Sequence, residues 1–247
     1  MSLASRTRAL LPLRVQPFAR YHYERWRGLL ERELPLLCAA IAPGDRVIDV
    51  GANVGVYTYA LRRRGAIVEA FEPQPGCHDV LGAYASADSG VRLHPTALGA
   101  GRARATLRIP RVHGRLASGS ASLVKDEENA EAESVDVEVR PLDSYEFDAV
   151  RAIKIAVEGA ELGVLQGARE TLARHKPLLL VEIEQRHHTD PIDRIFDAVL
   201  GMGYRGEFVL PGLGIMPLSE FKVDLHQRAP TREERRAYVN NFFFRPV

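Results

Sequence analysis

The stretch that decides the fold runs Arg46-Val-Ile-Asp-Val-Gly-Ala-Asn-Val-Gly-Val-Tyr-Thr58. Its first half predicts a buried strand, and the glycines that follow predict a tight turn that opens a helix. A second apolar segment, Ala70-Phe-Glu-Pro73, places a carboxylate twenty-one residues after Gly51. A strand, a glycine turn and an acidic residue about 20 positions further on form the framework that holds an adenosine-containing cofactor.

The spacing within the turn favours S-adenosylmethionine (SAM) over a dinucleotide. A dinucleotide site reads G-x-G-x-x-G, and its middle glycine lets the backbone approach a pyrophosphate. Here the spacing is Asp49-x-Gly51-x-x-x-Gly55, and Asn53 stands at the middle position. We expect the two glycines to pass close to the methionine part of SAM, Asp49 to lie near its ammonium, and Glu72 to accept hydrogen bonds from both ribose hydroxyls. An ordinary strand-to-helix turn with a solvated glutamate is one alternative, and an NAD-dependent oxidoreductase is another.

Composition fits one large α/β domain. The chain has 247 residues, of which 46% are hydrophobic, and its formal net charge of +1 supplies no bulk field that would attract nucleic acid. Cys38 and Cys77 lack the spacing of metal ligands and favour a reducing compartment. No apolar run has the length of a membrane span. We therefore expect a cytoplasmic protein that has no nucleic-acid partner and no integral membrane segment, and we leave its oligomeric state open.

Residues 1–42 are expected to form a helical extension to a domain that spans residues 43–247. Residues 1–23 contain four arginines and no acidic residue, a pattern that superficially resembles a transit peptide. From Phe18 to Ala40 apolar residues recur at helical spacing, which predicts a helix packed on the edge of the domain. The same basic, aromatic pattern fits a helix that rests on a membrane or shapes the acceptor pocket, so peripheral membrane contact stays open.

Alternating strands and helices predict a three-layer α/β/α fold around a doubly wound, mostly parallel sheet of seven strands. The strands are expected near residues 46–50, 67–72, 91–94, 152–157 and 178–184, and the helices near 54–64, 75–86, 160–174 and 191–203. Residues 205–210 and 241–245 predict an antiparallel hairpin that closes the sheet, and residues 104–109 and 135–140 predict an added hairpin. The segment 113–134 reads as a long loop that could cover the substrate.

Several motifs resemble the FkbM family of SAM-dependent methyltransferases. They are Val47-Ile-Asp-Val-Gly-Ala-Asn-Val-Gly55, Phe71-Glu-Pro73, Thr96-Ala-Leu-Gly99, Ser120-Ala-Ser-Leu123, Pro141-Leu-Asp-Ser144, Ile153-Lys-Ile-Ala-Val-Glu-Gly-Ala-Glu161, Val164-Leu-Gln-Gly-Ala168 and Lys176-Pro-Leu-Leu-Leu-Val-Glu182. The first two indicate only a class I methyltransferase, whereas the block Lys-Ile-x-Val-Glu-Gly-x-Glu is typical of this family. The resemblance implies a Rossmann-like class I methyltransferase fold. It also implies methyl transfer to a hydroxyl of a sugar, polyketide or other natural product, with S-adenosylhomocysteine (SAH) as the second product.

The expected cofactor-binding residues follow from the turn and from this resemblance. They are Asp49, Gly51, Asn53, Gly55, Tyr57, Thr58, Glu72, Ala97, Leu98 and Ser122. The resemblance places Ala97 and Leu98 against the adenine, and Ser122 against the cofactor or the acceptor.

One position departs from the family pattern. Where the motif usually reads Lys-Ile-Asp-Val-Glu-Gly, this chain has Ala156. An alcohol attacks a methyl group poorly unless a base within hydrogen-bond reach takes its proton, and alanine cannot do so. Three interpretations stay open: an engineered inactivating substitution, a natural enzyme that uses another base, and a cofactor-binding protein that has lost catalysis.

Three nearby residues are candidates for the proton acceptor. Glu158 is either a base or substrate contact, or a cap for the next helix. Glu182 ends an apolar run, where a carboxylate is unfavourable unless paired, so it is a candidate base or orienting group. His187, next to His188, could serve as a base near neutral pH, although adjacent loop histidines are often simply exposed. We expect no bound metal, because without an aspartate at position 156 the two glutamates alone would make a poor Mg²⁺ site.

Overall fold

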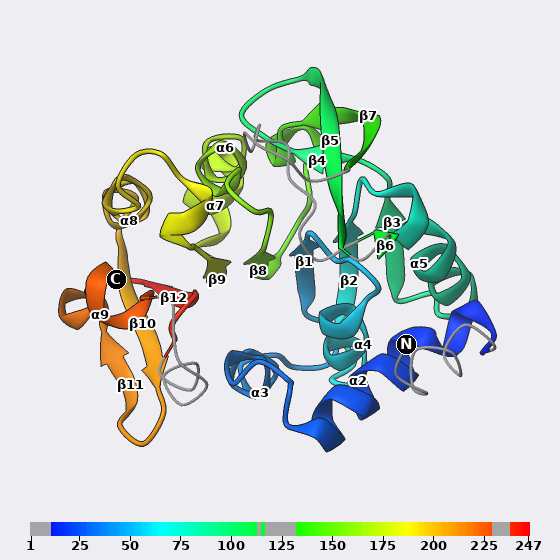
Figure 1. Cartoon of the computed structure of the whole chain (residues 1–247), viewed down its shortest axis with the longest axis horizontal. Helices are drawn as coiled ribbons and strands as arrows, with labels where there is room; N and C mark the ends of the chain where they lie inside the picture. The colour runs from blue at the N-terminus through cyan, green and yellow to red at the C-terminus, as the bar shows by residue number, and fades with distance from the viewer. Residues whose placement is uncertain (1–10, 113–114, 117–131, 229–237) are drawn as a thin grey trace.

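The computed structural model describes residues 11–112, 115–116, 132–228 and 238–247. Within this part of the chain, a sheet of eight strands lies between two layers of helices (Figure 1). In spatial order the strands are β11 (Gly214–Pro217), β10 (Tyr204–Leu210), β12 (Asn241–Pro246), β9 (Leu178–Glu182), β8 (Val150–Ile155), β1 (Arg46–Val50), β2 (Ile67–Phe71) and β3 (Val91–His94). The five strands from β9 to β3 are parallel, and β12 runs antiparallel between β9 and β10. The predicted α/β sheet with its antiparallel C-terminal hairpin is therefore confirmed, with β11 as an eighth strand that we did not predict.

Helices cover both faces of the sheet. They are α2 (Gln16–Arg27), α3 (Glu33–Ala39), α4 (Val56–Arg62), α5 (Pro75–Ala87), α6 (Glu161–Gln166), α7 (Arg169–His175), α8 (Asp193–Leu200) and α9 (Val223–His226). Short 3₁₀ turns occur at η1 (Leu13–Val15), η3 (Leu142–Tyr145), η4 (Gln185–His187) and η5 (Leu218–Glu220). In Figure 1, α2, α3 and α4 lie on one side of the sheet, and α6, α7 and α8 lie on the other.

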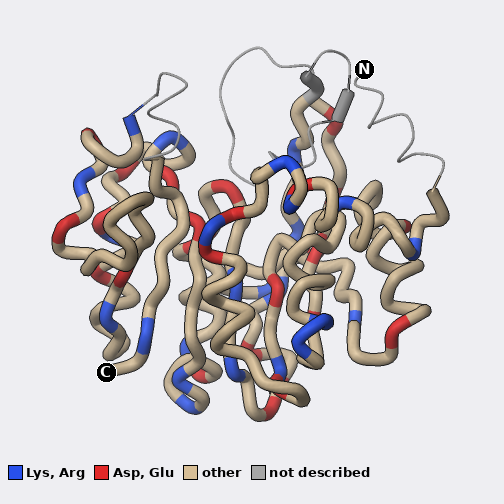
Figure 2. The backbone as a smooth tube through the Cα atoms, turned by 90° about the horizontal axis from the view of Figure 1, so that it is seen from below, with Lys and Arg blue, Asp and Glu red and all other residues tan. Residues whose placement is uncertain are grey.

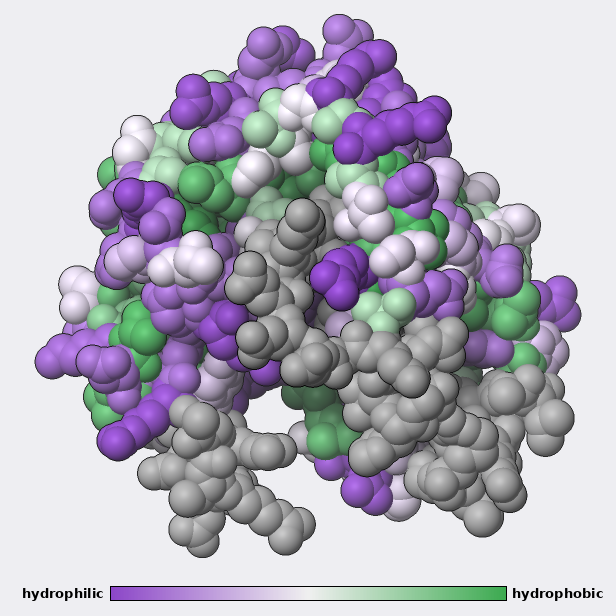
Figure 3. All heavy atoms as spheres, turned by 45° about the horizontal axis from the view of Figure 1, so that its top comes forward, coloured by the Kyte–Doolittle hydropathy of each residue, from purple (hydrophilic) through white to green (hydrophobic). Residues whose placement is uncertain are grey.

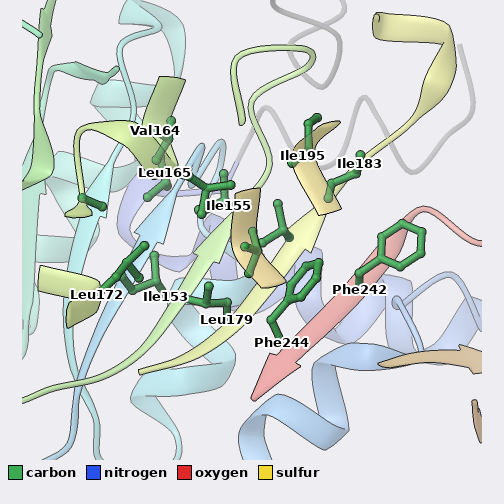
Figure 4. Close-up of a cluster of buried hydrophobic side chains, with 14 of the residues drawn as sticks. Ile153, Ile155, Val164, Leu165, Leu172, Leu179, Ile183, Ile195, Phe242 and Phe244 are labelled. Atoms are coloured by element: carbon green, nitrogen blue, oxygen red, sulfur yellow. The ribbon is translucent and has the colours of Figure 1, made fainter. Parts of the chain in front are cut away.

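The core follows from the alternation of side chains along each strand. Ile153, Ile155 and Leu179 point to one face, where they meet residues of α6, α7 and α8 (Figure 4). The intervening residues Ala152 and Leu180 point to the other face and pack with α3 and α4. Because both faces are buried, these strands read as nearly continuous apolar runs.

Two helical predictions are wrong in one respect: each expected helix is divided. The helix expected from residue 18 to residue 40 is broken at Gly28, whose φ of 65° is left-handed and ends α2. The helix expected over 160–174 is divided at Gly167. A Cβ on Gly167 would lie 2.0 Å from the carbonyl oxygen of Gly99, so a close chain crossing accompanies this break.

A second, smaller sheet stands at one edge of the molecule. It contains β4 (Ala97–Leu98), β7 (Ala132–Arg140), β5 (Ala103–Val112) and β6 (Arg115–Leu116). The antiparallel pairing of β5 with β7 confirms the added hairpin. The expected loop over 113–134 is wrong at two places, because residues 115–116 form β6, which pairs with β5, and residues 132–134 belong to β7. The rest of it lies outside the described residues.

The described surface is mixed in character. Basic and acidic residues are interspersed along the chain (Figure 2), and on the face shown in Figure 3 hydrophobic side chains are separated by hydrophilic ones. Among the residues that the structure describes, no helix is both long and apolar enough to cross a bilayer.

Candidate active site

A cavity of about 320 Å³ opens where the parallel strands end. It lies at the carboxyl ends of β1, β2, β8 and β9, and β1 is where the strand order reverses, with β2 on one side and β8 on the other. Open α/β sheets bind their ligands at this kind of position. The residues that line it are Arg20, Glu24, Leu29, Leu30, Glu31, Leu34, Val50, Gly51, Ala52, Asn53, Val54, Val56, Tyr57, Phe71, Glu72, Pro73, Thr96, Ala97, Leu98, Leu107, Lys154, Ala156, Val157, Glu158 and Glu182.

At the end of β2, Glu72 is held in a fixed orientation. One carboxylate oxygen accepts the backbone N–H of Asn53 and the other accepts that of Gln74, both at 2.8 Å. Burial raises the pKa of Glu72, and these two hydrogen bonds oppose the rise. Because a carboxylate oxygen can accept more than one hydrogen bond, Glu72 retains acceptor capacity toward the cavity. This capacity fits the two ribose hydroxyls of SAM.

The wall beside Glu72 is apolar. Phe71, Ala97 and Leu98 line the cavity and are buried, and the short strand β4 holds Ala97 and Leu98 beside β7. An adenine ring is flat and largely apolar, so this wall fits the base of the cofactor. Ser122, which we placed against the cofactor or acceptor, lies outside the described residues.

The glycines of the turn are required by the protein's own chain. Gly51 has a φ of 73°, and a Cβ there would lie 1.9 Å from the carbonyl oxygen of Ala156. Gly55 has a φ of 84°, and a Cβ there would lie 2.8 Å from a methyl group of Leu81. Gly51 lines the cavity and Gly55 does not. We expected these glycines to let the backbone approach the cofactor. In the structure they first of all let segments of the protein's own chain approach one another.

Asp49 and Thr58 lie behind the turn and do not line the cavity. Both are fully buried, and Thr58 Oγ1 donates a hydrogen bond to Asp49 Oδ2 at 2.7 Å. Lys154 Nζ lies 3.5 Å from Asp49 Oδ1 and donates to the carbonyl oxygen of Gly51 at 2.9 Å. The structure therefore connects Asp49 to the glycine turn through Lys154, rather than exposing it to the cavity.

Tyr57 links the turn to the N-terminal helices. It lines the cavity, and its hydroxyl donates to Glu31 Oε2 at 2.5 Å. Burial, followed by the nearby charge of Glu31, raises the pKa of Tyr57 well above its ordinary value. The Lys154 ammonium lies 5.2 Å from the centre of the Tyr57 ring.

Glu182 lies beside Ala156 at the carboxyl ends of two neighbouring strands. Ile155 pairs with Val181 in the parallel ladder, so Ala156 and Glu182 are the next residues on neighbouring strands, and both line the cavity. Asn240 Nδ2 donates to Glu182 Oε1 at 2.7 Å. Burial, then repulsion from Glu31 and Glu158, raises the pKa of Glu182 to about 8. A carboxyl group with such a pKa can change its protonation state near neutral pH.

The two histidines are paired rather than simply exposed. His187 Nε2 contacts Glu158 Oε2, and this hydrogen bond raises the pKa of His187. His188 Nε2 lies 3.0 Å from Glu161 Oε2. Glu158 lines the cavity whereas His187 does not, so His187 lies behind the lining, in contact with Glu158. Glu161, the first residue of α6, accepts the backbone N–H of Gly159 at 2.8 Å.

The sequence did not predict which residues of the N-terminal helices line the cavity. Arg20 and Glu24 of α2, together with Leu29, Leu30 and Glu31 in the connection to α3, form one wall. No motif marks these residues, because their position depends on how α2 packs against α4. Within the described ranges, no group of three His, Cys, Asp or Glu residues is placed to hold a metal ion.

Comparisons with known proteins agree with this geometry. Residues 49–205, more than half of the chain, match the Methyltransferase FkbM domain. Among solved structures, the methyltransferase FkbM from Methylobacillus flagellatus KT is 19% identical with a TM-score of 0.52, and the alignment covers 88% of this chain but only 45% of that one. An rRNA methylase from Streptococcus thermophilus is 12% identical, with a TM-score of 0.46 and coverage of 87% and 94%. A Streptococcus mutans protein solved in complex with SAH is 11% identical, with a TM-score of 0.45 and coverage of 88% and 99%.

No curated protein matches the sequence. The domain match extends over more than half of the chain and shows its family. The chain therefore belongs to the FkbM family of SAM-dependent methyltransferases, and SAM is its cofactor.

Proposed function

We propose that this protein is an O-methyltransferase that acts on a hydroxyl of a sugar, polyketide or other natural product. The observation that carries the proposal is a single cavity that joins Glu72, a carboxylate suited to a ribose diol, to Glu182, a carboxyl group with a pKa of about 8. A cofactor held at Glu72 and an acceptor near Glu182 would share this cavity. The same proposal includes a domain boundary between residues 42 and 43 and a cytoplasmic location.

The cofactor-binding side of the cavity follows from the fixed groups. Glu72 would hold the ribose, and Ala97 and Leu98 would pack against the adenine. Gly51, Asn53 and Tyr57 would lie along the rest of the molecule, while Asp49, Gly55 and Thr58 would keep the turn in place from behind. When bound, SAM supplies an electrophilic methyl group on a sulfonium.

On the acceptor side, we assign the proton acceptor to Glu182. Its oxygen Oε1 is held by Asn240, and its pKa of about 8 lets it take a proton from an alcohol as the new bond forms. Glu158, oriented by His187, places a second charge beside it and helps to set this pKa. Among the three interpretations of Ala156, this assignment favours a natural enzyme that uses another base.

The first experiment is a calorimetric titration of the purified protein with SAM, SAH and NAD. We expect SAM and SAH to bind and NAD not to bind. Binding of NAD alone, or of none of the three, would contradict our interpretation of the glycine turn. Release of SAH is then measured with a panel of sugar and polyketide alcohols. If SAM binds and no alcohol in the panel supports SAH release, the alternative of a cofactor-binding protein without catalysis gains over the enzyme.

A further inference from the structure

Exposed apolar side chains gather in the N-terminal elements. Among the described residues, ten large hydrophobic side chains are exposed, and five of them lie between residues 11 and 29: Leu11, Leu13, Phe18, Trp26 and Leu29. Trp26 is 79% exposed, which is unusual for so large an apolar side chain. Trp26 lies on the side of α2 opposite the buried Pro17, nine residues away. Phe18 lies about 80° around the helix from Trp26, and its ring, half exposed, contacts Tyr59 of α4 edge-on.

Arginines surround these apolar residues. Between residues 11 and 29 the chain has four arginines and one acidic residue, Glu24, which pairs with Arg20. Arg14, Arg25 and Arg27 are exposed. Arg63 of the segment after α4 adds a further positive charge, because its guanidinium lies over the ring of Tyr21 on α2. The face is thus both apolar and positively charged.

This combination favours a lipid surface over a second copy of the chain. A helix with tryptophan, phenylalanine and leucine on one side and arginines beside them is typical of helices that lie in the headgroup region of a membrane. A symmetric pair of chains would bring the exposed arginines of two α2 helices together, which is unfavourable. Figure 1 shows α2 along the outer edge of the helical layer, beyond α4, where a flat surface can reach it.

We propose that α2 docks this protein on an anionic lipid surface, with Phe18, Trp26 and Leu29 entering the headgroup region and Arg25 and Arg27 contacting the negative headgroups. Leu29 also lines the cavity, so docking would bring the cavity close to the membrane surface. The proposal rests on this surface and not on the methyl-transfer proposal.

The chain offers a direct probe, because Trp26 is its one tryptophan. The 247-residue chain is mixed with phosphatidylcholine vesicles that contain 30% phosphatidylglycerol, and with vesicles of phosphatidylcholine alone. We expect the fluorescence of Trp26 to shift to the blue, and the protein to sediment, with the anionic vesicles only. Because binding includes attraction between exposed charges, we also expect it to weaken as salt is added.

Two matched variants separate the local surface from total charge. Arg25→Gln combined with Arg27→Gln should lower affinity for the anionic vesicles about 30-fold, since each basic residue near the surface contributes about 1 kcal/mol. Arg169→Gln combined with Arg174→Gln removes the same charge from exposed positions on α7, across the sheet from α2, and should leave affinity unchanged. Circular dichroism verifies that both variants fold.

Three results would overturn the proposal. The first is the absence of any blue shift or sedimentation with anionic vesicles. The second is an equal loss of affinity in the two double variants, which would point to total charge alone. The third is a blue shift that depends on protein concentration without lipid, which would show that a second copy of the chain covers α2.

Discussion

Replacement of Glu182 by glutamine should stabilise the protein at alkaline pH while it removes the group that we propose as base. The substitution keeps the size of the side chain, and the amide oxygen can still accept the hydrogen bond from Asn240. It eliminates a carboxyl group whose charged form is disfavoured by burial and by Glu31 and Glu158. The expected effects on stability and on activity therefore have opposite signs.

The size of the stability effect follows from the pKa of Glu182. The pKa rises from 4.5 in the unfolded chain to about 8 in the folded protein. A raised folded pKa contributes stability below pH 4.5, and this contribution is lost as the pH rises through 8. At 1.36 kcal/mol per pKa unit, the advantage of Glu182→Gln should grow from about zero at pH 4.5 to about 3 kcal/mol at pH 7, with an upper limit of about 5 kcal/mol above pH 8.

The assay is denaturant unfolding of both proteins at pH 5, 7 and 8.5. The difference between their free energies of unfolding isolates Glu182 from other titrating groups. Glu170→Gln, at an exposed position on α7, serves as the control, and its difference should stay near zero throughout. If the Glu182→Gln difference is the same at pH 5 and pH 8.5, Glu182 does not have a raised pKa, and the basis for its role as proton acceptor is lost.

Three further predictions concern the same cavity. Glu31→Gln removes a negative charge near Glu182 and should therefore lower the pKa of Glu182. The rising limb of the pH–rate profile, which we expect near pH 8, should then move to lower pH. A limb that does not move would contradict this prediction. Ala156→Asp adds a carboxylate next to Glu182 and should move the rising limb of the pH–rate profile to higher pH. Faster SAH release at pH 7 would instead show that the new aspartate takes the proton itself. Glu72→Gln should weaken SAH binding by about 10- to 100-fold in calorimetry, because hydrogen bonds to a charged group contribute about 1.5–3 kcal/mol; unchanged affinity would place the ribose elsewhere.

The sequence predicted the parts of the fold that depend on local patterns. The apolar runs of β1, β2, β8 and β9 and the positive-φ turn at Gly51 were readable because burial on both faces and a tight turn each leave a direct signal. Gly28 is also visible in the sequence as a possible helix end. We nevertheless predicted one continuous helix, because apolar residues recur at helical spacing on both sides of this single glycine. The division at Gly167 is accompanied by a close approach to Gly99, which is 68 residues away and leaves no signal in local patterns.

The candidate site was predicted in its residue types more than in its connections. Glu72, Glu182 and Glu158 line one cavity, as strand ends in a parallel sheet would suggest. The hydrogen bond from Asn240 to Glu182 joins residues 58 positions apart, and the one from Tyr57 to Glu31 joins residues 26 apart. Both depend on tertiary packing. The sequence also could not tell whether Gly51 approaches a ligand or the backbone of Ala156, because either contact requires the same missing Cβ.

The charges around the cavity give alanine at position 156 a physical reason. Glu31, Glu158 and Glu182 all line the cavity, and the charges of Glu31 and Glu158 act on Glu182. Among the described lining residues, Arg20 pairs with Glu24. Lys154, which is held by Gly51 and Asp49, opposes the rise in the pKa of Glu182 but does not cancel it. A fourth carboxylate would add repulsion without a new cation to offset it.

A site arranged in this way would not need an aspartate just after β8, because the proton acceptor that we propose lies one strand further along, at the end of β9. Burial, together with repulsion from Glu31 and Glu158, raises the pKa of Glu182 to about 8, and an aspartate at position 156 would raise it further. We therefore interpret Ala156 and Glu182 as one arrangement, in which the absence of the first carboxylate keeps the pKa of the second within reach of neutral pH. In the Ala156→Asp experiment, a rising limb of the pH–rate profile that moves to higher pH supports this arrangement. A gain of activity at pH 7 contradicts it.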